Sequence, residues 1–136
     1  LPAGGSRLPA SHETVDSKLH YIRMEGKEVF KQAVRQMEKA VNSCLRNTGI
    51  KKEDIRWMVP HQANIRIIEA LAKRFQVELE KVYLTIYKYG NTSASSVGIA
   101  LDELVREKEL KQGEHIVLFA FGSGLTWGAA ALTCEV

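Results

Sequence analysis

Two strand-length apolar segments near the C-terminal end restrict the fold of this chain more than any other feature of its sequence. They run from His115 to Phe121 and from Leu125 to Cys134, with only Gly122-Ser123-Gly124 between them. Strands joined by so short a connection pair antiparallel, as a hairpin. The glycines favour a tight turn, although exposed backbone N–H groups in such a turn can also bind an anion. The sequence therefore predicts a C-terminal antiparallel hairpin.

The rest of the chain alternates between helical and extended patterns. Apolar residues at spacings of three and four predict amphipathic helices over Lys27 to Asn47, Asn64 to Phe75 and Ser93 to about Lys108. Shorter patterns predict a strand at Lys18 to Met24, a buried strand at Ile55 to Val59 and an extended segment at Lys81 to Tyr87. This order predicts an α/β fold, a mixed sheet flanked by helices and closed by the hairpin.

Composition narrows the class of protein. The 136 residues suffice for one domain, which we expect over residues 18–136, after a proline- and glycine-rich loop or lid at residues 1–17. A net charge of +3 gives no argument for a nucleic-acid partner, and no apolar run reaches the roughly 20 residues of a membrane span. Two cysteines make neither a disulfide framework nor a zinc site, so we expect a soluble cytoplasmic protein without a metal. Because the chain begins at Leu1 and not at Met, we expect a piece of a longer protein.

Two polar residues lie at the ends of predicted elements, where open α/β sheets bind ligands. His61 follows the buried strand and precedes a helix, so its imidazole can stabilise an oxyanion or exchange a proton. Asn91 lies among small residues that allow close approach of a ligand, and its amide can donate to a carbonyl. Taken singly, a space-filling role for His61 and helix capping by Asn91 are the better interpretations.

Basic residues recur on the predicted helices. Lys27, Lys31 and Arg35 are four residues apart and form one stripe, while Arg66, Lys73 and Arg74 share the next helix. Such stripes are usually solvated helix faces. The alternative is a surface that binds phosphate groups or an acidic partner.

Three motifs in this order resemble the β-ketoacyl-acyl carrier protein synthase III family. They are Met58-Val59-Pro60-His61-Gln62-Ala63-Asn64-Ile65-Arg66, Gly90-Asn91-Thr92-Ser93-Ala94 and Ala120-Phe121-Gly122-Ser123-Gly124-Leu125-Thr126-Trp127-Gly128. The similarity covers the whole chain but only the C-terminal half of a complete family member. It implies a thiolase-like fold and a decarboxylating condensation that joins an acyl group, often acetyl, from coenzyme A to malonyl-acyl carrier protein. Both thioesters are substrates, and no cofactor is implied.

The resemblance also implies roles for individual residues. His61 and Asn91 would hydrogen-bond the malonyl thioester carbonyl, while the backbone N–H of Ser123 would hold the acyl-enzyme oxygen, with Phe121 beside the active-site opening. The residues implied in substrate binding are Gly26, Gln62, Ala63, Asn64 and Arg66. Those implied in attracting the acidic carrier protein are Lys31, Arg66, Lys73 and Arg74.

The nucleophilic cysteine of the family belongs to the N-terminal half, which this sequence does not contain. Cys44 lies on the apolar stripe of a helix and Cys134 in a strand, so neither is in the exposed turn that activates a thiolate. We therefore expect this chain alone to be inactive, to pair with the N-terminal half, and to form a homodimer when complete. The alternatives are a non-catalytic module that binds coenzyme A or the carrier protein, and a related polyketide-type condensing enzyme.

Overall fold

The structure is a computed structural model that describes residues 1–135, and the chain forms two compact units. The first covers residues 1–30 and the second begins at Lys31. The predicted boundary after residue 17 falls inside the first unit. Val136, the last residue of the predicted half-domain, lies outside the described residues.

In the first unit a short helix, α1 (His12–Asp16), forms in the segment that we predicted to be only loop. A capping box explains why a helix begins there. The side chain of Ser11 accepts from the backbone N–H of Thr14, and the side chain of Thr14 accepts from the backbone N–H of Ser11. This reciprocal pair satisfies two amide groups that the first helical turn leaves without partners.

The strand predicted at Lys18 to Met24 is absent from the described residues, and that prediction is wrong. Residues 17–20 form a turn in which Lys18 has a left-handed φ of 54°, and residues 22–25 are irregular. Tyr21, Ile22 and Met24 are all exposed, so the alternating pattern buries neither face. A strand needs a neighbouring strand to satisfy its backbone, and none of the described strands pairs with this segment.

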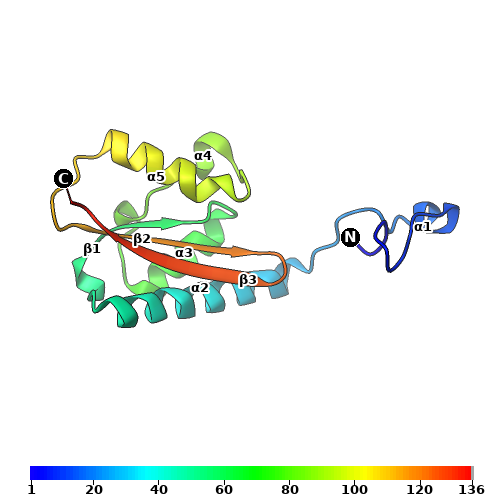
Figure 1. Ribbon diagram of the computed structural model, residues 1–136, viewed down its shortest axis with the longest axis horizontal. Helices are drawn as coiled ribbons and strands as arrows, with labels where there is room; N and C mark the ends of the chain where they lie inside the picture. Colours follow the sequence, from blue (N-terminus) through cyan, green and yellow to red (C-terminus); the bar gives the residue numbers. More distant parts are fainter. Residues whose placement is uncertain (136) are drawn as a thin grey trace. The chain divides into compact units, whose positions relative to one another are not determined.

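The remaining elements confirm the predicted order of helices and strands (Figure 1). They are α2 (Gly26–Thr48), η1 (Lys52–Asp54), β1 (Ile55–Pro60), α3 (Ile65–Phe75), η2 (Leu79–Lys81), α4 (Ile86–Tyr89), α5 (Ser95–Glu107), β2 (His115–Gly122) and β3 (Thr126–Thr133). Among the helices of residues 1–135, none has both the length and the apolar content needed to cross a membrane.

The sheet has the order β1-β2-β3, with β1 parallel to β2 and β2 antiparallel to β3. The mixed sheet and the C-terminal hairpin predicted from the sequence are therefore confirmed. The segment Lys81 to Tyr87 departs from its prediction in part. Only Val82 pairs, through a single parallel bridge to Met58, and the chain turns helical at Ile86.

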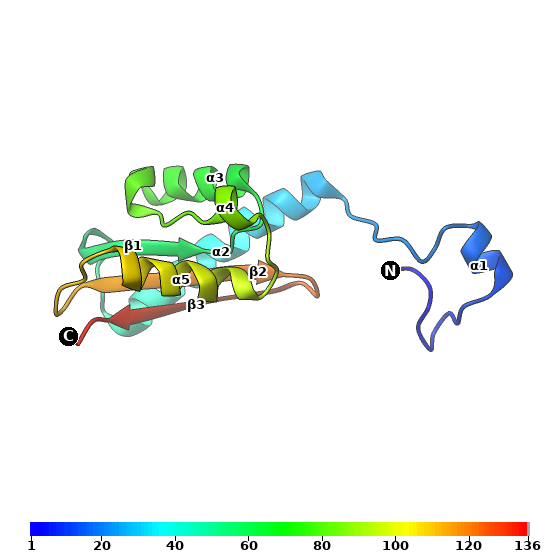
Figure 2. The ribbon, with the colours of Figure 1, turned by 90° about the horizontal axis from the view of Figure 1, so that it is seen from above.

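Helices cover both faces of the sheet in the second unit (Figures 1 and 2). On one face α5 encloses a core made of Trp57, Val59, Tyr83, Ala100, Leu104 and Ile116. On the other face lie α2 and α3, where Phe75 of α3 meets Phe119 of β2 edge to face, with ring centroids 6.1 Å apart. This three-layer arrangement fixes the end of β1 between two packed faces, and His61 follows directly after this end.

Candidate active site

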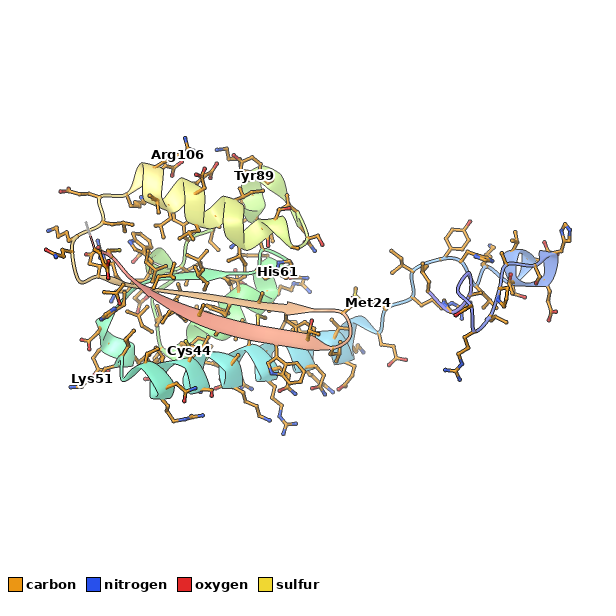
Figure 3. The ribbon with its side chains drawn as sticks, in the orientation of Figure 1. Met24, Cys44, Lys51, His61, Tyr89 and Arg106 are labelled. Carbon is orange, nitrogen blue, oxygen red and sulfur yellow. The ribbon has the colours of Figure 1, made fainter. Side chains whose placement is uncertain are left out.

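His61 extends the parallel pairing of β1 and β2 by one residue. Its backbone N–H donates to the carbonyl of Phe119 at 2.8 Å, directly after the strand ends at Pro60. The imidazole therefore lies at the carboxyl end of the sheet, and Figure 3 shows it there. It is half-buried, and this burial lowers the pKa of His61 below its ordinary value of 6.5. A neutral imidazole at pH 7 follows.

The imidazole has one hydrogen-bond partner among the residues that the structure describes. Its Nδ1 lies 2.5 Å from the hydroxyl oxygen of Ser96, in the first turn of α5. The same oxygen accepts from the backbone N–H of Gln62 at 3.2 Å. Ser96 is only 1% exposed, so water does not compete for this hydroxyl. The hydrogen bonds therefore fix the ring from its buried side.

The side chain of Gln62 is fully buried and uses its amide within the protein. Its Nε2 donates to the carbonyls of Pro60 at 2.8 Å and Tyr83 at 3.2 Å. Its Oε1 accepts from the backbone N–H groups of Thr85 at 3.0 Å and Ile86 at 3.1 Å. This side chain thus joins the end of β1 to the segment before α4.

An open cavity of about 550 Å³ lies beside the imidazole. It is lined by His61, Ser93, Ala94, Val97, Ala120, Phe121, Gly122, Ser123, Thr126, Trp127 and Gly128. Three of the four residues assigned to the reaction centre therefore line one cavity. They are His61 at the end of β1, and Phe121 and Ser123 in the hairpin. The fourth, Asn91, is not among the lining residues, but it contacts one of them.

Asn91 shapes the loop at the edge of this cavity. Its Oδ1 accepts from the backbone N–H of Ser93 at 2.9 Å, and Ser93 has a left-handed φ of 56°. Helix capping does not explain the asparagine, because α5 begins at Ser95 and its N-cap is Ala94. The exposed amide nitrogen of Asn91 remains available to a ligand, since the hydrogen bonds described within residues 1–135 use only its oxygen.

The residues assigned to substrate and carrier-protein binding differ in their exposure to solvent and in their hydrogen bonds and ion pairs. Asn64 caps α3 by accepting from the backbone N–H of Arg66 at 2.9 Å, and half-buried Ala63 precedes it. Lys31, Arg66 and Lys73 are exposed. Arg74 forms an ion pair with Glu38 of α2, so part of its charge is already compensated. Gly26 is the first residue of α2 and belongs to the first unit.

Sequence reasoning overlooked Ser96, although one signal identifies it. Ser96, Ala100 and Leu104 are four residues apart and are the three buried residues of α5. A serine in phase with the buried stripe of a helix must find a polar partner in the core. That spacing separates it from its exposed neighbours Ser93 and Ser95.

Neither cysteine lines the cavity beside His61. Both Cys44 and Cys134 are half-buried, the former on α2 and the latter against the core under α5. Within the described part of the chain, no group of three or more His, Cys, Asp or Glu side chains is placed to hold a metal ion.

A protein family and several curated relatives match this chain. Residues 45–134 match the family described as 3-oxoacyl-[acyl-carrier-protein (ACP)] synthase III C terminal. The beta-ketoacyl-[acyl-carrier-protein] synthase III of Chlamydia muridarum (strain MoPn / Nigg) is 60% identical over 132 residues, which are 97% of this chain and 40% of the relative. The chain thus spans about two-fifths of the length of the curated relatives that it matches.

Solved structures match as well. The 3-oxoacyl-[acyl-carrier-protein] synthase III from Aquifex aeolicus VF5 has a TM-score of 0.80 and 50% identity, over 84% of this chain and 37% of that one. The priming beta-ketosynthase from the R1128 polyketide biosynthetic pathway has a TM-score of 0.79 and 34% identity, over 93% of this chain and 39% of that one. These matches confirm the predicted thiolase-like fold.

Proposed function

Because the chain belongs to the 3-oxoacyl-[acyl-carrier-protein] synthase III family, matching its C-terminal part, we propose that it forms the C-terminal half of a decarboxylating condensing enzyme. The complete enzyme joins an acyl group, often acetyl, from coenzyme A to malonyl-acyl carrier protein and so initiates fatty-acid synthesis. One observation carries the proposal: the imidazole of His61, held by Ser96 and neutral at pH 7, lines one cavity with Phe121 and Ser123.

His61 and Asn91 act on the malonyl thioester. Both donate hydrogen bonds to its carbonyl oxygen while the bond to the carboxylate breaks and carbon dioxide leaves. The electron pair of that bond moves into an enolate, whose oxygen charge the two donors stabilise. A neutral imidazole serves as such a donor without transferring its proton. The exposed amide of Asn91 and the small residues around it support this role.

The enolate carbon then attacks the acyl group that the enzyme carries as a cysteine thioester. A carbon–carbon bond forms, and the cysteine leaves as thiolate. The backbone N–H of Ser123 stabilises the oxyanion formed in this step, and Phe121 lies beside the opening of the site. Their presence in the cavity that contains His61 supports both assignments.

The cysteine nucleophile is supplied by the N-terminal half of the enzyme, so this chain by itself does not catalyse condensation. Apolar surface on β3 argues for a second polypeptide that covers it, because the side chains of Trp127 and Leu132 are 48% and 39% exposed there.

The complete enzyme is a cytoplasmic homodimer. It receives the acidic carrier protein and the phosphates of coenzyme A at Lys31, Arg66 and Lys73, which are exposed cations. Ala63 and Asn64, at the start of α3, border the substrate arm.

A polyketide-type priming synthase is the second candidate. The similarity to the R1128 priming beta-ketosynthase over 93% of this chain favours it. Both candidates use the same decarboxylation, and they differ in the acyl group that primes the cysteine. Comparing acetyl-coenzyme A with longer acyl-coenzyme A primers separates them.

A chimaeric enzyme tests the proposal. This chain replaces the C-terminal 40% of the Chlamydia muridarum relative, and decarboxylation of malonyl-acyl carrier protein is measured. We expect an active chimaera in which His61→Ala lowers kcat about 100-fold, the typical cost of losing one oxyanion donor. The control is His115→Ala, since His115 bonds Thr133 in the sheet and does not line the cavity. If the His61→Ala chimaera decarboxylated malonyl-acyl carrier protein as fast as the unaltered chimaera, a non-catalytic binding module would be the better description of this chain.

A further inference from the structure

The hydroxyl of Ser96 lies between two groups of different character. On one side is the backbone N–H of Gln62 at 3.2 Å, and on the other is Nδ1 of His61 at 2.5 Å. The residue is 1% exposed, so the protein alone decides which way the hydroxyl proton points.

The direction of both hydrogen bonds follows from the chemistry of the partners. A backbone N–H can only donate, so the Ser96 oxygen accepts from Gln62. The hydroxyl then has one proton left to donate. Among the hydrogen bonds described for residues 1–135, the acceptor within its reach is Nδ1 of His61. An imidazole nitrogen that accepts a hydrogen bond carries no proton, and in a neutral ring the proton is then on Nε2.

The groups that impose this direction are held firmly. Ser96 lies on the buried stripe of α5 with Ala100 and Leu104. The backbone N–H of Gln62 is fixed because its side chain joins Pro60 to the segment at Thr85. Both the serine and the backbone N–H that orients its hydroxyl are therefore held in place.

We propose that Ser96 is a positioning residue that selects the Nε2–H tautomer of His61 and thereby makes the imidazole a hydrogen-bond donor toward the cavity. Its effect on catalysis rests on the proposed function, whereas its effect on the tautomer does not. Among the hydrogen bonds described for residues 1–135, none besides that of Ser96 supplies a donor to Nδ1, so without this hydroxyl the ring is free to carry its proton on either nitrogen.

Nuclear magnetic resonance on this chain tests the tautomer directly. The ¹⁵N shifts of the imidazole nitrogens separate the Nε2–H from the Nδ1–H form. The chain has four histidines, and the signals of His61 are those lost in His61→Gln. Above the pKa of the ring, we expect the Nε2–H form in the unaltered chain. In Ser96→Ala we expect a mixture of both forms, and Ser95→Ala, which alters an exposed neighbour, should match the unaltered chain.

An Nδ1–H form of His61 in the unaltered chain would overturn the inference, even if Ser96→Ala proved unable to fold. So would equal tautomer populations in the unaltered chain and in Ser96→Ala.

The same substitutions in the chimaera measure the catalytic consequence. We expect Ser96→Ala to lower kcat for decarboxylation about tenfold with KM nearly unchanged, a size typical for losing a partner that orients a functional histidine. Ser95→Ala should retain full activity. A chimaera in which His61→Ala is impaired and Ser96→Ala is fully active would contradict the inference and leave the proposed function standing. A chimaera with no decarboxylation would contradict the proposed function, and the tautomer measurement would still decide the role of Ser96.

Discussion

Two asparagines of this chain make the same local hydrogen bond in very different surroundings. Asn64 accepts from the backbone N–H of Arg66, and Asn91 accepts from the backbone N–H of Ser93, each at 2.9 Å. Asn64 caps α3, whose inner face is buried, whereas Asn91 precedes α5 without capping it. The fold therefore explains Asn64 fully and explains Asn91 only as the start of a turn. Polar residues that the fold does not use are the better candidates for chemistry.

The same contrast separates two adjacent residues. Gln62 uses both ends of its amide to join the end of β1 to the segment before α4. His61 uses one ring nitrogen on Ser96 and lines the cavity with the rest of its ring. Both belong to one motif, yet the amide of Gln62 is used within the fold, whereas His61 borders the cavity.

The largest effect is expected from Gln62→Ala. The substitution leaves the buried carbonyls and N–H groups that the amide contacts without partners, and it opens a small cavity. We expect the free energy of unfolding to fall by about 3 kcal/mol, measured by urea denaturation of this chain. The control is Gln112→Ala, which alters an exposed glutamine and should change stability by less than about 0.5 kcal/mol. Equal stability of the two variants would mean that Gln62 does not hold the fold.

A smaller effect separates the two asparagines. Asn64→Ala removes the N-cap of α3 and should lower the free energy of unfolding by about 1 kcal/mol. Asn91→Ala, at an exposed turn, should lower it by less than about 0.5 kcal/mol. In the chimaera the order should reverse, with Asn91→Ala losing far more decarboxylation than Asn64→Ala. A larger stability loss in Asn91→Ala would assign that asparagine to the fold and would remove the contrast.

The elements that the sequence predicted correctly are those with a strong local pattern. The helix at Lys27 to Asn47 and the hairpin around Gly122-Ser123-Gly124 follow from apolar spacing and turn length, and both are present. The strand predicted at Lys18 to Met24 failed because alternation does not supply a pairing partner, which is a property of the whole fold. Ser96 was overlooked for a related reason, since its contact with His61 joins residues 35 positions apart. Local patterns predict elements, whereas the partners of polar side chains depend on how the elements pack.

The smallest effect is the dependence of stability on pH that His61 contributes, because a half-exposed side chain is screened by solvent. Burial lowers the pKa of His61 in the folded chain, while the unfolded chain keeps the ordinary value of about 6.5. Below that value the unfolded state binds the proton more readily. The stabilisation is therefore complete above about pH 6.5 and is lost as the pH falls through the lower folded pKa.

Urea denaturation at about pH 7.5 and about pH 5.5 measures this loss, and His61→Gln isolates it because the other titrating groups are common to both chains. We expect the unaltered chain to lose more stability between the two pH values than His61→Gln does. Asn91→Ala should follow the unaltered chain, since the amide of Asn91 does not titrate. Equal losses in the unaltered chain and in His61→Gln would mean that the ring is charged as easily in the folded state as in water. The pKa of His61 would then equal that of an exposed histidine. Burial beside Ser96 would not explain why the imidazole acts as a neutral hydrogen-bond donor.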